Sequence, residues 1–185
     1  MLRLILTFSV LAASMQISQA IAQEEMTDAE KLAASRDTWD DLKQKCVGNY
    51  RYFVRTSSFT GFGTETEIVV RRNKVAGRRF LVSGGIERVL PEGEPEAPQH
   101  KWVEKGEEVG KNKEGAPPKT LDELYDEAEK VIAHELAEHE KLYLRFDKQG
   151  LLTSCFYVDT RIADDAPTTG VTISAIKLEG EKKQE

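Results

Sequence analysis

Residues 49–83, NYRYFVRTSSFTGFGTETEIVVRRNKVAGRRFLVS, decide the fold of this chain. In 49–56, two tyrosines and a valine alternate with Arg51, Phe53 and Arg55, which predicts a strand with two different faces. Two more β-prone runs, 64–72 and 75–83, are joined through Asn73-Lys74, and asparagine tolerates the left-handed backbone of a tight hairpin turn. Short links between strands imply antiparallel pairing, so we expect three antiparallel strands here.

A helix is predicted on each side of this β-rich region. Thr27 with Glu30 and Thr120 with Glu123 both fit a capping box, which satisfies free amides at a helix start. The predicted helices cover 27–45 and 121–140, and each carries an apolar stripe at helical spacing. The stripe residues are Leu32, Ser35, Trp39 and Leu42 in the first helix, and Leu121, Leu124, Tyr125, Ala128, Ile132 and Leu136 in the second.

The second half of the chain predicts three further strands, at 141–147, 151–159 and 169–178. Between the halves, residues 91–118 hold five of the six prolines and show no periodicity, so we expect a long loop in which Trp102 and Val103 form a short strand. The order α-β-β-β-loop-α-β-β-β predicts an α+β fold, a two-layer sandwich of antiparallel sheet with the helices on one face.

The N-terminus has the layout of a secretory signal peptide over residues 1–22. Arg3 precedes an apolar core of about ten residues, too short to cross a bilayer, and small residues end the segment at Ala22. We therefore expect export to the periplasm or the medium, a single domain over 23–178 and a charged tail at 179–185. Removal of Arg3 with the signal peptide changes the net charge from −6 to −7, which argues against broad nucleic-acid binding.

Two cysteines, Cys46 and Cys155, remain in the predicted mature chain. An even number of cysteines in an exported protein predicts one disulfide. The alternative is a pair of buried free thiols, since spacing alone does not supply the geometry of a disulfide.

The segment His134-Glu135-Leu136-Ala137-Glu138-His139 is similar to the zinc-protease pattern H-E-x-x-H, but the histidines are five residues apart instead of four. On a helix, that spacing turns the second ring about 140° away from the first. We therefore predict surface histidines, and no metal or cofactor. An enzyme that uses His134 or His139 with nearby glutamates, a hydrolase or a metal-dependent enzyme, is the alternative.

A local reversal of charge suggests a contact surface on this acidic protein. Basic residues crowd the hairpin, and Trp102 stands in the proline-rich loop; together they could contact an anionic envelope component or another protein. The candidate contact residues are Arg71, Arg72, Lys74, Arg78, Arg79 and Trp102. The alternative is that the basic residues keep the hairpin soluble and discourage edge pairing.

Three pieces of the chain resemble a family of small exported bacterial proteins that is described only as a domain of unknown function. The pieces are Asn49-Tyr50-Arg51-Tyr52 followed by Ile68-Val69-Val70, then Lys119-Thr120-Leu121-Asp122-Glu123-Leu124-Tyr125, then Phe146-Asp147, Gly150, Val158-Asp159 and Asp164-Asp165. The resemblance implies export and a compact α+β fold, and it implies no reaction. From the lack of a catalytic constellation in the sequence, together with the loop that carries Trp102 and the basic hairpin on an acidic chain, we expect a non-enzymatic binding or structural domain at the cell envelope.

Overall fold

The computed structural model describes residues 26–57, 62–83, 100–162 and 167–180. The predicted signal peptide lies outside the described residues, as do 91–99 of the predicted loop and 181–185 of the tail. The helices are α1 (Asp28–Lys45), the short 3-10 turn η1 (Gly106–Glu108) and α2 (Leu121–Ile132). The strands are β1 (Tyr50–Ser57), β2 (Gly63–Arg71), β3 (Lys74–Ser83), β4 (His100–Lys105), β5 (Glu140–Phe146), β6 (Leu152–Asp159), β7 (Thr169–Thr172) and β8 (Ala175–Leu178).

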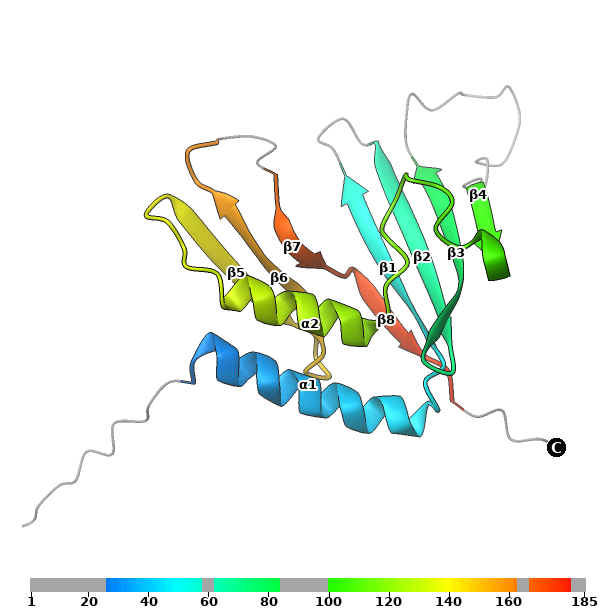
Figure 1. The fold of residues 1–185 in the computed structure, drawn as a ribbon, viewed down its shortest axis with the longest axis horizontal. Helices are drawn as coiled ribbons and strands as arrows, with labels where there is room; N and C mark the ends of the chain where they lie inside the picture. The colour runs from blue at the N-terminus through cyan, green and yellow to red at the C-terminus, as the bar shows by residue number, and fades with distance from the viewer. Residues whose placement is uncertain (1–25, 58–61, 84–99, 163–166, 181–185) are drawn as a thin grey trace, which may run out of the picture.

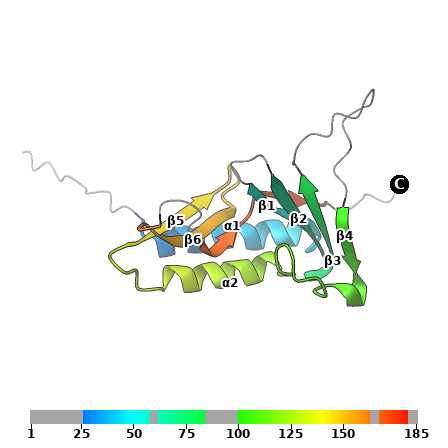
Figure 2. The same cartoon turned by 90° about the horizontal axis from the view of Figure 1, so that it is seen from above.

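The strands form two antiparallel sheets (Figure 1). One has the order β4-β3-β2-β1-β8 and the other the order β5-β6-β7. Both helices contribute to one core with side chains from both sheets, and they lie on the same side of the strands (Figure 2). The predicted α+β fold, with antiparallel sheet and helices on one face, is confirmed.

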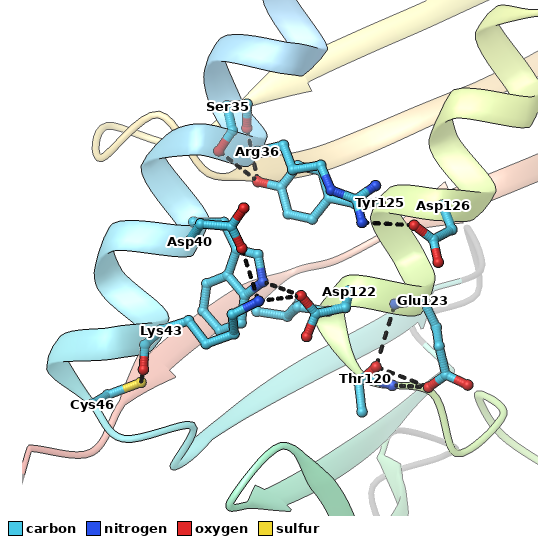
Figure 3. Close-up of polar contacts among 12 residues, drawn as sticks. Ser35, Arg36, Asp40, Lys43, Cys46, Thr120, Asp122, Glu123, Tyr125 and Asp126 are labelled. Carbon is cyan, nitrogen blue, oxygen red and sulfur yellow. Dashed lines mark hydrogen bonds and ion pairs between the residues drawn. The ribbon is translucent and has the colours of Figure 1, made fainter.

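Polar contacts tie the two helices together (Figure 3). Both predicted capping boxes are present. The Lys43 ammonium lies 2.6 Å from an Asp122 carboxylate oxygen, and Arg36 pairs with Asp126 and Glu129. Since residue 43 meets residue 122 and residue 36 meets 126 and 129, the helices run antiparallel.

Three core tyrosines fasten α2 to the sheets through their hydroxyl groups. The backbone N–H of Leu121 donates to the Tyr50 hydroxyl at 2.9 Å, and the Tyr52 hydroxyl donates to a backbone carbonyl just before the helix. The hydroxyl of Tyr125 lies 2.8 Å from that of Ser35 and accepts from the N–H of Leu152. Burial raises the pKa of each of these phenols, which therefore stay neutral.

The prediction of one strand over 169–178 is wrong, because the segment bends at Ile173-Ser174 and its halves join different sheets. β7 pairs with β6, and β8 pairs with β1. The bend also shifts the alternation by one residue, so Val171, Ile173 and then Ile176 all reach the core. A regular strand would have placed Ile176 on the opposite face from the other two.

The second helix is shorter than predicted and ends at Ile132. The Glu140 carboxylate accepts from the backbone N–H of Ala137 and from Nε2 of His134, both at 3.0 Å, which closes a turn at this place. Several glutamates follow the helix, and negative charge disfavours further winding at a helix C-terminus. Leu136, predicted on the apolar stripe, is 39% exposed.

Residues 100–118 of the predicted loop are built onto the first sheet. His100–Lys105 forms β4, as expected for the part that holds Trp102, and pairs with β3. Residues 109–118, which we call the stretch after η1, lie on the core side of β2 and β3. The N–H of Ala116 donates to Thr66, and Gly115 lies against Phe80. This stretch therefore extends the cover that the helices give to the rest of the sheet.

Candidate functional site

The faces of the two sheets that point away from the helices form one broad surface. The strand registers assign residues to this surface, since side chains alternate between faces and directly paired residues share a face. We call it the open face. Its side chains are those of Arg51, Phe53, Arg55, Glu65, Glu67, Val69, Arg71, Lys74, Arg79, Leu81, Val103, Lys105, Lys141, Tyr143, Arg145, Ser154, Phe156, Val158, Thr172, Ala175, Lys177 and Glu179.

Charge is divided between the two layers of the molecule. The open face carries nine lysines and arginines against three glutamates. The two helices together carry ten acidic and five basic residues. The sheet layer is therefore basic on a chain whose net charge is −6, and such a surface attracts anions.

A nearly buried carboxylate organises the centre of the open face. The Glu67 side chain is 7% exposed and lies 3.0 Å from an Arg51 nitrogen and 2.9 Å from an Arg79 nitrogen. Arg51 also pairs with Glu179, which lies 2.8 Å from Arg71. Burial alone would raise the pKa of Glu179, but the hydrogen bond from Arg51 and the nearby arginine charges outweigh burial and lower it. These glutamates hold the arginines in place while the basic charge stays in excess.

Aromatic rings lie among the basic residues of the open face. Tyr143 and Phe156 are directly paired across β5 and β6 and stack with ring centroids 5.3 Å apart. The ammonium of Lys141 lies 5.2 Å from the centroid of the Tyr143 ring. On β1, the Lys177 ammonium lies 5.1 Å from the Phe53 ring. The alternation in 49–56 predicted that Phe53 shares a face with Arg51 and Arg55, whereas Phe156 and Lys177 are brought to this surface by the strand registers.

The predicted contact residues of the basic hairpin separate into two groups. Arg71, Lys74 and Arg79 belong to the open face, and Arg72 is exposed in the two-residue turn beside them. Arg72 and Asn73 both have positive φ, so the hairpin turns at 72–73, one residue earlier than the predicted Asn73-Lys74 link. The hairpin thus extends the basic surface at one end of the strands.

Arg78 and Trp102, also predicted as contacts, lie on the core side instead. Arg78 is 2% exposed, and its guanidinium donates to the Glu104 carboxylate and to two backbone carbonyls of the stretch after η1. The Trp102 ring lies 4.7 Å from the guanidinium carbon and stacks on Phe80. Arg78 is therefore buried within the fold, and Trp102, which is half-buried, packs on the same side of the sheet.

Glu104 receives enough hydrogen bonds to stay charged in this buried place. Burial alone would raise its pKa, but the N–H groups of Asn112 and Gly110, the Asn112 side chain and Arg78 all donate to it. Together they lower the pKa of Glu104 to about 2.

The two histidines of the enzyme alternative lie after α2, not on it. His134 stacks on Tyr157 with ring centroids 4.4 Å apart and bonds to Glu140, and His139 lies 3.8 Å from Asp159. His134 and His139 therefore contact different carboxylates, Glu140 and Asp159, and do not share one site. Within the described ranges, no three histidine, cysteine, aspartate or glutamate side chains are grouped so that they could hold a metal ion.

The predicted disulfide between Cys46 and Cys155 is wrong: both cysteines are free and buried. Cys46 caps the end of α1, where its thiol donates to the carbonyl of Lys43. Cys155 lies on β6 beneath α2 and donates to the carbonyl of Ala128. The two thiols belong to different parts of the core, and burial raises the pKa of Cys155 to about 11, which makes it unreactive.

No protein-family model matches the chain, and neither a curated protein nor a solved structure matches it. Among the described helices, none is long and apolar enough to cross a membrane.

Proposed function

We propose that this chain is an exported, non-enzymatic binding domain that takes an anionic partner on the open face. The division of charge between the layers carries the proposal: nine basic side chains on the open face against three glutamates, backed by acidic helices. Opposite charge on the far layer orients an approaching anion towards the basic side.

Several of these cations are free to meet a ligand. Lys141, Arg145 and Lys177 are exposed, and no carboxylate within ion-pair distance is found for them in the described part of the chain. A ligand anion would therefore gain their charge without having to displace a carboxylate of the described residues.

A charge-reversal pair of variants tests the proposal. The triple variant Lys141→Glu/Arg145→Glu/Lys177→Glu removes cations from the open face. The control, Lys111→Glu/Lys113→Glu/Lys130→Glu, makes the same change in net charge at exposed positions elsewhere. Binding to polyacrylate, to a short oligogalacturonate and to phosphatidylglycerol vesicles is measured by titration calorimetry at low and physiological salt.

The open-face variant should weaken every interaction that the wild type makes by at least tenfold, and binding should fall with added salt because exposed charges are screened. The control should change affinity by less than threefold. Equal loss in both triple variants, or no binding of the wild type to any probe, would refute the open face as the binding surface.

Export is the other half of the proposal, and it rests on the three-part layout of residues 1–22. N-terminal sequencing of the protein recovered from periplasm or medium should give a chain that starts at Gln23. Recovery of the chain only from the cytoplasm, with its first residues intact, would contradict export.

A further inference from the structure

We infer that the anionic partner is an acidic polysaccharide, whose sugar rings pack on the aromatic side chains of the open face while its acidic groups pair with the adjacent lysines and arginines. This inference rests on the proposed function and names the ligand class of the same surface.

The first aromatic platform lies on β5 and β6. Tyr143 and Phe156 are half-buried and stack on each other at an interplanar angle of 23°, so the two rings form one aromatic patch, which we call the first platform. Lys141 and Arg145 flank Tyr143 on the same strand and face. A sugar ring presents flat arrays of C–H groups that suit such a platform, and an acidic group on the ring would reach either cation.

A second platform lies on β1, where Phe53 has Lys177 over its ring. Phe53 pairs with Ala175, whereas Phe156 pairs with Gly170. The platforms therefore lie on different sheets, one strand spacing of about 5 Å from β8 and from β7 respectively, and five residues apart along that segment across its bend. A chain of several sugars can reach both platforms, whereas a single phosphate or lipid headgroup cannot.

The glutamates of the open face fit a sugar better than a lipid surface. Glu65 and Glu179 are 23% and 29% exposed, so their carboxylates can accept hydrogen bonds from sugar hydroxyls. Glu67, which pairs with Phe53 across β1 and β2, is nearly buried between two arginines and only holds them in place. Among the described residues, Val103 is the one open-face member of the exposed large apolar side chains. Proteins that bind membranes peripherally insert protruding apolar side chains, and this face offers few.

The test compares ligands with and without rings. Affinity for a short oligogalacturonate is measured against polyacrylate of matched charge, oligo-dT of similar length and phosphatidylglycerol vesicles. The proteins are the wild type and the double variant Tyr143→Leu/Phe156→Leu, which keeps apolar volume but removes the rings. Phe62→Leu, which removes an exposed ring outside the open face, is the control, and circular dichroism verifies that each variant is folded.

Oligogalacturonate should bind tightest, and the double variant should weaken it about tenfold while leaving polyacrylate unchanged. Tighter binding of oligo-dT or of vesicles would overturn the inference, in favour of nucleic acid or of a lipid surface. If the charge-reversal triple weakens polyacrylate but the ring variant affects no ligand, the proposed function stands and the polysaccharide falls. If the wild type binds no probe, both fall.

Discussion

The guanidinium of Arg78 stabilises the fold through buried hydrogen bonds and a contact with an aromatic ring. It donates to Glu104 at 2.8 Å and to the carbonyls of Asn112 and Ala116 at 2.8 and 2.7 Å, and it lies over the Trp102 ring. These bonds connect β3, β4 and the stretch after η1. A buried ion pair of this kind is costly to break, because removal of one partner leaves the other charge unpaired.

Arg78→Ala should therefore lower the free energy of unfolding by about 3–5 kcal/mol, measured by urea denaturation. The control is Lys74→Ala on the same strand, which is exposed and should stay within about 0.5 kcal/mol of the wild type. A loss below about 1 kcal/mol for Arg78→Ala would show that the guanidinium is not held as described.

The same pair makes stability depend on pH. The pKa of Glu104 falls from 4.5 to about 2 on folding, so its charge stabilises the native state fully above pH 4.5, and this contribution is lost as the pH falls through 2. Glu104→Gln does not titrate, so the stability gap between it and the wild type should narrow over that range. A gap that stays constant from pH 5 to pH 2 would contradict the lowered pKa.

At the scale of elements, the stretch after η1 is held against the sheet by a close approach at Gly115. This residue has φ of 77°, and a Cβ there would lie 2.6 Å from Oγ1 of Thr66 and 2.9 Å from the Phe80 ring. Any side chain at this position would thus meet both a strained backbone and a steric clash.

Gly115→Ala should detach the stretch from β2 and β3, with faster amide exchange at Ala116 and a loss of about 2–4 kcal/mol in unfolding free energy. Gly106→Ala is the matched control: its φ is 55°, but a Cβ there meets no atom within 4 Å. It should cost only the backbone strain, about 1 kcal/mol. Equal losses in the two variants would mean that the contact with Thr66 and Phe80 contributes nothing.

Elements fixed by local patterns were predictable, and elements fixed by contacts distant in sequence were not. The capping threonines and the alternation in 49–56 depend on neighbours in sequence, and both helix starts and the first strand are confirmed. The early end of α2 depends on Glu140, and the bend in 169–178 depends on two strands from different halves of the chain. Part of the open face was also predictable, because Arg51, Phe53 and Arg55 alternate with core residues along a single strand. The burial of Arg78 was not predictable, because its neighbours are also basic and only the pairing of β3 with β2 and β4 places its side chain on the core side.

At the scale of the whole molecule, the segment that bends between β7 and β8 joins the two sheets, because β7 belongs to one sheet and β8 to the other. The N–H of Ile173 donates to the carbonyl of Thr153 on β6, and the N–H of Ser174 donates to the carbonyl of Phe53 on β1. A single cluster of buried side chains extends from Tyr50 in one sheet to Val171 in the other. Among the described residues the two sheets share this cluster, so separation of the sheets would expose apolar surface in both.

Unfolding should therefore be a single cooperative transition, and the two tryptophans offer probes at opposite ends of it. Trp39 is fully buried between the helices and the core, whereas Trp102 lies on the edge strand β4. In the variant Trp102→Phe, the remaining Trp39 reports by its fluorescence on the helices and the core. In the variant Trp39→Phe, the remaining Trp102 reports on the edge of the first sheet. Within each variant, the urea midpoint from fluorescence should coincide with that from far-ultraviolet circular dichroism, even though the variants differ in overall stability. A Trp102 signal lost at a lower urea concentration than the circular dichroism would mean that β3, β4 and the stretch they carry unfold separately from the shared core.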